Sequence, residues 1–222
     1  MQLDFSPILE RLPYLIGGAW LSLQIAFLAF FLGMLLGLGG ASIRAYGPGW
    51  AKRLVGVYVV FFTNTPQLIQ IFFIFFALPD AGVVLTPYSA VLIGMTLNAG
   101  AYLTEIQHAG FKSVRRPELE AADTLGFSHL QTVRYVILPH ILRVLFPPLS
   151  NQYILMTLGT SMAAVFGVEE LTGRTYNINS ETFRSIEVFL VAAALYIVIT
   201  LIATLSLAFI GKRFFRAKMR WF

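Results

Sequence analysis

The sequence predicts an all-α membrane protein with five transmembrane helices. Hydrophobic residues make up 57% of the 222 residues and charged residues only 12%, whereas a soluble domain carries about 25% charged residues. The charges also cluster, and they leave five uncharged stretches, each longer than the ~20 apolar residues that cross a ~30 Å hydrocarbon core as a helix. A chain this short is not expected to bury five such helices in a soluble core.

The five predicted spans cover roughly residues 15–40, 54–78, 87–108, 140–165 and 188–210 of one domain over residues 1–222. Basic residues follow the first, third and fifth spans: Arg44, Lys52, Arg53, Lys112, Arg115, Arg116, Arg134, Lys212, Arg213, Arg216, Lys218 and Arg220. Because loops rich in Lys and Arg stay in the cytoplasm, we expect the N-terminus outside and the C-terminus inside. The net charge of +5 is therefore expected to face anionic membrane lipid, and no nucleic-acid partner is predicted.

The first span carries a ridge of small residues, Gly33, Gly37 and Ala41, at helical spacing. Such ridges allow close approach between helices, so we expect this one to pack against another span. Near the inner end of the third span, Glu105 is expected to pair with a cytoplasmic base, because a proton relay would require a deeper acid. No metal site is predicted, since no ligand spacing is formed by His108, His129 and His140.

Pro66 interrupts the second span and should free the backbone carbonyl of Phe62, one turn earlier. Polar groups inside a membrane span either bond to partners or line a cavity. Polar residues of the second, third and fourth spans are therefore candidates for lining a pathway through the membrane for a solute: Thr63, Asn64, Thr65, Gln67, Asn98, Asn151 and Gln152. Hydrogen bonding between helices is the alternative role, and the sequence leaves both open.

The loop after the third span, residues 113–138, contains a predicted helical hairpin. Pro117 suits the first turn of a helix, and Glu120 suits its positive N-terminal end. Gly126 tolerates the left-handed conformation that ends helices. The following Ser128–Gln131 is a capping-box pattern, which starts a second helix. A charged helix–turn–helix is thus expected at the inner membrane surface.

The hairpin resembles the EAA signature of permease subunits of ATP-driven importers. The matching residues are Glu120, Ala121 and Ala122, Gly126 after three residues, and Val136, Ile137, Leu138 and Pro139 after nine more, with valine where the signature has isoleucine. The resemblance implies a coupling helix that lies in a cleft of a separate ATPase subunit. The implied coupling residues are Glu120, Ala121, Ala122, Gly126, Leu138 and Pro139.

Further stretches resemble the polar amino-acid permeases, which serve histidine, glutamine, arginine and glutamate. They are residues 62–70, 101–114, 147–152, 160–171 and 182–188, and the similarity runs from about residue 14 to residue 212. It implies the permease fold of type I ABC importers. It also adds three residues of the matching stretches to the candidate solute pathway: Tyr102, Thr160 and Ser161.

The resemblance implies a subunit that imports a polar amino acid by alternating access across a bacterial cytoplasmic (inner) membrane. Its implied partners are a cytoplasmic ATPase dimer, a second permease chain and an external solute-binding protein. ATP and Mg would bind to the ATPase, because this chain has no G-x-x-x-x-G-K-[ST] loop and is not itself an enzyme. A permease for an opine or another small polar solute is an alternative. An ion-coupled secondary transporter is disfavoured by span interiors without ionisable groups.

The sequence departs from the family at two places. The family commonly has arginine where Thr63 stands, and a Lys-Asp pair where Leu158 and Gly159 stand. If those charges hold substrate in relatives, a second and different permease chain would supply them here. A heterodimer is therefore favoured, with a homodimer as the alternative.

Overall fold

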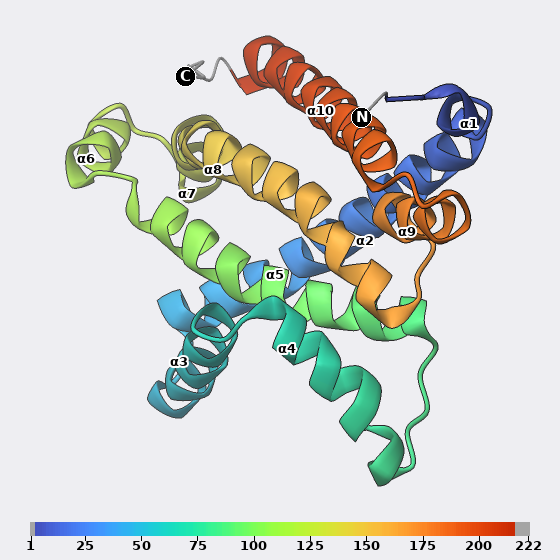
Figure 1. Cartoon of the computed structure of the whole chain (residues 1–222). Helices are drawn as coiled ribbons and strands as arrows, with labels where there is room; N and C mark the ends of the chain where they lie inside the picture. Colours follow the sequence, from blue (N-terminus) through green and yellow to red (C-terminus); the bar gives the residue numbers. More distant parts are fainter. Residues whose placement is uncertain (1–2, 216–222) are drawn as a thin grey trace.

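The computed structural model describes residues 3–215 (Figure 1). The predicted basic residues Arg216, Lys218 and Arg220 lie outside the described residues. Helical elements follow one another in the order α1 (Ser6–Leu9), α2 (Leu12–Tyr46), α3 (Gly49–Thr63), α4 (Gln67–Phe72), η1 (Phe73–Ala77), η2 (Pro79–Ala81), α5 (Pro87–Lys112), α6 (Arg116–Thr124), α7 (His129–Thr132), η3 (Val133–Ile137), α8 (Leu138–Gly159), η4 (Thr160–Phe166), α9 (Leu171–Thr182), α10 (Ser185–Ile210) and η5 (Gly211–Phe215). The described residues contain no strand, so the all-α prediction is confirmed for them.

Helix α5 lies in the centre and packs most extensively against α2 (Figure 1). The approach is close because α2 presents glycines: a Cβ at Gly33 would lie 2.7 Å from the Cβ of Ala99. A Cβ at Gly37 would lie 2.8 Å from the Cβ of Leu103. The predicted role of the small-residue ridge is therefore confirmed.

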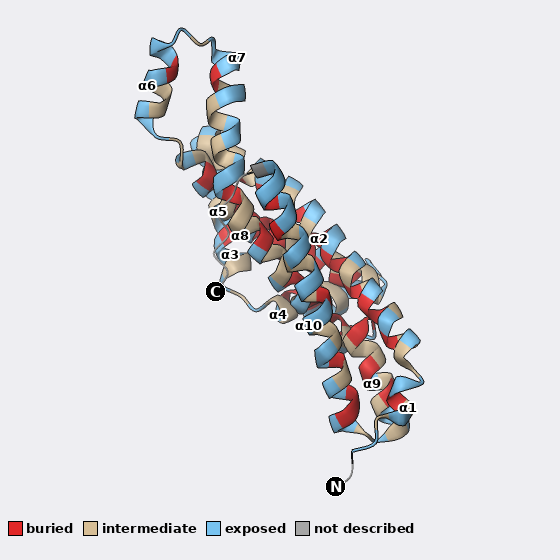
Figure 2. Ribbon diagram, turned by 90° about the horizontal axis from the view of Figure 1, so that it is seen from above, coloured by how far each residue is buried: buried red, intermediate tan, exposed pale blue. Residues whose placement is uncertain are grey.

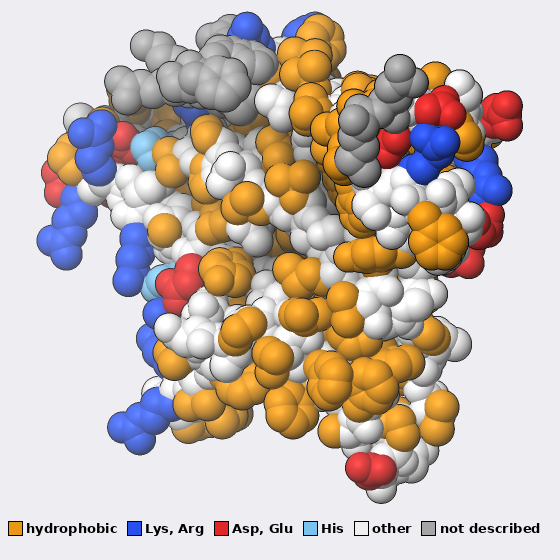
Figure 3. All heavy atoms as spheres, viewed as in Figure 1, with side chains coloured by type: hydrophobic (Ala, Val, Ile, Leu, Met, Phe, Trp, Pro, Cys, Tyr) orange, Lys and Arg blue, Asp and Glu red, His pale blue; other side chains and the backbone are white. Residues whose placement is uncertain are grey.

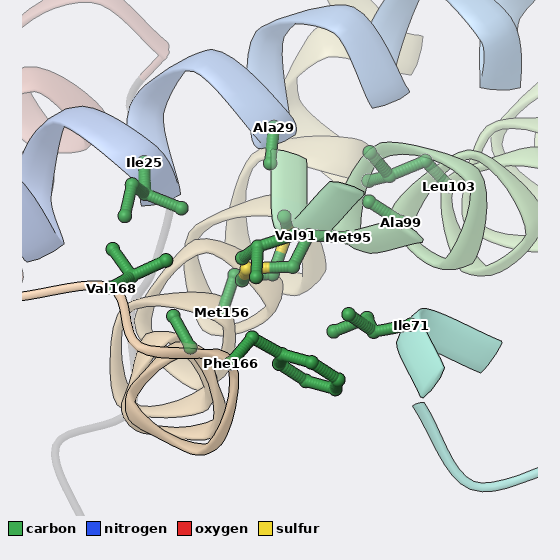
Figure 4. Packing of buried hydrophobic residues seen from close by; sticks show 11 residues of the cluster. Ile25, Ala29, Ile71, Val91, Met95, Ala99, Leu103, Met156, Phe166 and Val168 are labelled. Carbon is green, nitrogen blue, oxygen red and sulfur yellow. The ribbon is translucent and has the colours of Figure 1, made fainter. Parts of the chain in front are cut away.

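The largest buried cluster joins α5 to four other segments. Figure 4 shows Ile25 and Ala29 of α2, Ile71 of α4 and Phe166 of η4 around Val91, Met95, Ala99 and Leu103 of α5. These side chains interdigitate at a point where sequence-distant elements meet. The break between α3 and α4 is thereby held against α5, which fixes the polar groups at that break.

The structure contains fewer uninterrupted apolar helices than the five predicted spans. Among the described residues, α2 and the helix Ser185–Phe214 are long and apolar enough to cross a membrane alone. Two bent pairs raise the number to four if each is one span: Gly49–Thr63 with Gln67–Ala81, bent by 105°, and His129–Phe166 with Leu171–Thr182, bent by 47°. Helix α5 has 26 residues but carries buried polar side chains, including Asn98 and Gln107. The five-span count stays a prediction.

The two ends of the bundle differ in character. The α6–α7 hairpin projects from one end, and α1 and α9 lie at the other (Figure 2). Basic side chains gather along the α3 and α6 side, whereas acidic and basic side chains mix over α1 and α9 (Figure 3). Glu105 forms an ion pair with Arg44 on the hairpin side, as predicted for that acid.

Candidate functional site

The α6–α7 hairpin turns at Gly126 through a Schellman motif. The N–H of Phe127 donates to the Ala122 carbonyl (3.0 Å), and the N–H of Gly126 donates to the Asp123 carbonyl (2.9 Å). Gly126 has φ = 72°, which is the left-handed region that glycine adopts without strain. These bonds satisfy carbonyls that a helix end would otherwise leave unpaired. The predicted turn at Gly126 is confirmed.

The second arm starts with the predicted capping box. Gln131 N–H donates to Ser128 Oγ (3.4 Å), and Ser128 N–H donates to Gln131 Oε1 (2.7 Å). The arm then continues without interruption from His129 through η3 into α8 and on to Phe166. The second arm of the hairpin and α8 thus form one continuous helical stretch. Leu138 and Pro139 lie in its first α8 turn, away from the hairpin tip.

The outward surface of the hairpin carries both charged and apolar side chains. Glu120 and Ala121 are exposed, whereas Ala122 is only 2% exposed, and Figure 2 shows a buried position on α6 on the side that faces α7. Leu125 and Leu130 expose 73% and 75% of their surface. Of the two alanines, only Ala121 is thus available to another chain, while Ala122 closes the hairpin itself.

A contact that the sequence analysis did not identify brings Glu118 of the hairpin next to α8. Glu118 Oε1 lies 3.3 Å from Arg115 Nη2, and its other oxygen lies 3.5 Å from His140 Nδ1. The i,i+3 spacing of Arg115 and Glu118 could have predicted their ion pair from the sequence. The contact between Glu118 and His140 could not be predicted in this way, because it depends on how the hairpin folds back toward α8.

The break between α3 and α4 uses its polar side chains to satisfy freed backbone. The Phe62 carbonyl, predicted to lose its helical partner, accepts from Gln70 Nε2 (3.0 Å) and Asn98 Nδ2 (3.1 Å). Asn98 also donates to Gln70 Oε1 (3.0 Å). A buried carbonyl left unpaired costs about 1–3 kcal/mol, so these two amides stabilise the bend. Gln70 was missing from the predicted site, although it stands four residues after Pro66 in an apolar run.

The other side chains of the break donate mainly to their own helix. Thr63, Asn64 and Thr65 donate to the carbonyls four residues earlier, at distances of 2.7–2.8 Å. Asn64 is exposed, so its amide oxygen remains accessible. The Tyr102 hydroxyl reaches the Thr63 carbonyl at 3.4 Å, which adds α5 to the same cluster.

The polar residues of α8 and η4 only partly join this cluster. The Gln67 Oε1 lies 3.6 Å from where a Cβ of Gly159 would be, which places the end of α8 beside the break. Thr160 and Ser161 donate to Thr157 and Leu158 carbonyls at 2.7 and 2.9 Å, and Thr160 is fully buried. Within residues 3–215, no hydrogen bond connects the break to Asn151 or Gln152.

Within residues 3–215, no group of three or more His, Cys, Asp or Glu side chains could hold a metal ion. The polar groups around the α3–α4 break are amides, hydroxyls and backbone carbonyls.

At the opposite end of the bundle, Glu170 forms a buried junction that the sequence analysis did not identify. Its Oε1 accepts from Gly173 N–H (2.9 Å), which caps α9, and its Oε2 accepts from the hydroxyls of Ser22 (2.9 Å) and Tyr196 (3.0 Å). The residue thus joins α2, α9 and α10. Burial raises the pKa of the Glu170 carboxyl, and the hydrogen bonds oppose that rise.

Known proteins resemble this chain over nearly its whole length. The glutamine transport system permease protein GlnP of Escherichia coli (strain K12) is 38% identical over 216 residues, covering 96% of this chain and 98% of its own. The L-cystine transport system permease protein TcyB of Bacillus subtilis is 36% identical and covers 82% and 78%. The octopine transport system permease protein OccM of Rhizobium radiobacter is 32% identical and covers 91% and 86%.

Solved structures agree with these sequence relatives. A chain from the crystal structure of an amino acid ABC transporter with histidines superposes with a TM-score of 0.88 at 31% identity, covering 96% of this chain and 100% of its own. A chain of the MetNI methionine ABC transporter, at 21% identity and TM-score 0.72, shares the fold. The model of the family described as binding-protein-dependent transport system inner membrane component matches residues 29–216. The chain belongs to this family and is a permease subunit of an ABC importer with the type I fold.

Proposed function

We propose that this permease subunit carries a polar amino acid from an external solute-binding protein to the cytoplasm, across a bacterial inner membrane. The relatives named for glutamine, cystine and amino acids support that substrate class. The exposed Asn64 at the α3–α4 break has an amide oxygen suited to accepting a hydrogen bond from the amino group of an amino acid. Five spans, an outside N-terminus and an inside C-terminus complete the proposal.

The observation that carries the proposal is the projecting α6–α7 hairpin. Its outward surface offers Glu120, Ala121 and the exposed Leu125, a charged and apolar combination typical of a small protein–protein contact. A dimer of ATPase subunits, holding ATP and Mg, would bind here. Because the second arm continues into α8, closure of the ATPases would tilt α8 and open the solute pathway to the other side.

A second permease chain completes the assembly. In this chain Thr63 and Gly159 stand near Gln67 and offer no charge to the ends of a zwitterion. A non-identical partner with charged residues at these positions would supply the charges, which favours a heterodimer. A symmetric assembly that transports with this chain as its only permease would contradict the heterodimer.

Uptake into vesicles that contain the complete complex tests the substrate. We expect glutamine or another polar amino acid to compete for ATP-driven uptake in a panel that includes an opine. Competition by octopine alone would favour the second candidate, opine import, for which the 32% identity to an octopine permease is the supporting observation. Uptake that persists without ATP and follows an ion gradient would contradict both.

A further inference from the structure

A long apolar groove lies between α2, α8 and α10, and neither the coupling hairpin nor the α3–α4 break uses it. Its volume is about 580 Å³. Its floor is formed by α2 residues including Phe27 and Phe30, and its walls by Leu145 of α8 and Ala203 of α10. In Figure 1, α8 and α10 run side by side with α2 behind them, and all three pairs of helices are in contact.

On α8 and α10 the groove lining lies in the half of the predicted span nearer the hairpin and the end of α10, whereas on α2 it runs from Leu23 to Met34, in the middle of the predicted span. Along α8 it runs from Leu142 to Tyr153, which corresponds to about 17 Å of helix. One leaflet of a hydrocarbon core measures about 15 Å, half of ~30 Å. Because α8 starts at Leu138 beside the hairpin, this half is the inner leaflet in the proposed orientation. The groove therefore has the length and position of one acyl chain of an inner-leaflet lipid.

The inner end of the groove is positively charged. Arg143 precedes the lining residue Phe146 by one helical turn, and Phe146 contacts Gly211, since a Cβ there would lie 2.5 Å from Phe146 Cε1. Lys212 and Arg213 follow directly and are exposed. Basic residues thus lie next to the groove lining in the sequence of both α8 and α10, and basic groups attract the anionic lipids of the inner leaflet.

We infer that this groove binds one anionic glycerophospholipid of the inner leaflet, with an acyl chain between α8 and α10 and its phosphate near Arg213. This rests on the membrane orientation of the proposed function. A second copy of this chain is a poorer occupant: it carries the same net charge of +5 and would bring like charges to the same depth. A spanning helix would also extend beyond a groove of one-leaflet length.

Spin-labelled phospholipids test the inference on the complete transporter in phosphatidylcholine vesicles. The fraction of motionally restricted label is measured with phosphatidylglycerol and with phosphatidylcholine. We expect a clear preference for phosphatidylglycerol in the wild type and its loss in Ala203→Phe, which fills the groove. Leu205→Phe is the matched control, because Leu205 lies on the same helix, is 53% exposed and does not line the groove; it should keep the preference.

The charged end is tested in the same way. Arg213→Gln should lower the preference for phosphatidylglycerol about five-fold, the factor that corresponds to about 1 kcal/mol per basic residue near an anionic surface. Arg53→Gln, at an exposed position of α3, should leave it unchanged.

Three results would overturn the inference. They are equal restriction of both lipids by the wild type, equal loss in Ala203→Phe and Leu205→Phe, and separation of the two permease chains by Ala203→Phe with the lipid preference intact. The last would identify the groove as a permease–permease contact. The restricted fraction of spin-labelled lipid can be measured without any uptake. Failure of amino-acid transport would therefore contradict the proposed function, while the lipid preference could still be interpreted.

Discussion

The α6–α7 hairpin and the α3–α4 break both interrupt an apolar chain with polar residues, but they use those residues differently. In the hairpin, backbone groups are satisfied locally by the Gly126 turn and the Ser128 cap, and Glu120 remains exposed. At the break, the buried side chains of Gln70 and Asn98 are occupied by the Phe62 carbonyl. Exposed polar groups are available to a partner, whereas occupied ones maintain the backbone. The hairpin is therefore the better supported contact site.

The largest expected effect is from charge reversal on the hairpin. Glu120→Lys should reduce ATP-driven uptake at least about tenfold, because disrupting a charged contact in an interface costs about 2 kcal/mol or more. Folding should be unaffected, since Glu120 is exposed. Uptake and the thermal midpoint of the purified complex are measured together, with Glu10→Lys at the opposite end as control. Normal uptake by Glu120→Lys would contradict the assignment of the hairpin as the contact site for a partner.

The next effect tests whether the hairpin needs its turn. Gly126→Val places a β-branched residue at φ = 72°, with a strain of about 1–3 kcal/mol. The hairpin should open and binding of the ATPase should weaken in a pull-down assay. Gly126→Asn is the matched control, because asparagine tolerates the left-handed region. If valine and asparagine variants bind the ATPase equally well, the turn does not matter for the contact.

Substitution of a buried amide at the α3–α4 break is expected to lower the stability of the folded chain. Gln70→Leu should cost about 1–3 kcal/mol, because it removes one donor from the Phe62 carbonyl and the partner of Asn98. Asn64→Ala, at an exposed position, should cost under ~1 kcal/mol and instead change the apparent KM for the solute. Thermal midpoints and uptake kinetics separate the two. A stable Gln70→Leu variant would show that the amides do not maintain the bend.

The smallest effect is a pH dependence at the buried junction around Glu170. Because burial raises the pKa of Glu170 in the folded chain, the folded state holds its proton to higher pH than the unfolded state. This residue's contribution to stability is therefore complete below its unfolded pKa and decreases as pH rises through the folded pKa. Glu170→Gln cannot lose a proton, and the hydroxyls of Ser22 and Tyr196 can accept from its amide.

The thermal midpoint of the wild type should accordingly decrease between acidic and neutral pH more steeply than that of Glu170→Gln. The comparison uses the same detergent and the same buffer series for both proteins. Parallel midpoint curves would contradict a raised pKa at this junction.

Local features of this protein were readable from sequence, and features that join distant segments were not. The Gly126 turn and the Ser128–Gln131 cap depend on neighbouring residues, and both were predicted. The Phe62 carbonyl was predicted to be free because Pro66 removes its partner, but the groups that bind it were not all identified. Asn98 and Gln70 are 28 residues apart, and Ser22 and Glu170 are 148 apart, so no spacing rule connects them.

The low hydropathy of α5 has a physical cause. Helix α5 lies among other helices, and its buried polar side chains bond to neighbours: Asn98 bonds to the break, and Gln107 Nε2 donates to the Met34 carbonyl (3.3 Å). A central helix therefore tolerates polar residues that lower its hydropathy. The stretch without charged residues between Asp80 and Glu105 predicts α5 as a span. The mean hydropathy of α5 alone does not.

The central claim is that the α6–α7 hairpin is the cytoplasmic contact of the ATPase. Since the chain has no cysteine, a single cysteine at exposed Asp123 can be labelled with a membrane-impermeant maleimide, and Glu10→Cys serves as the control for the other end. We predict that Asp123→Cys is labelled only in inside-out vesicles stripped of the ATPase, and that adding the ATPase back protects it. Labelling of Asp123→Cys from the outside, or equal labelling with and without the ATPase, would contradict the claim.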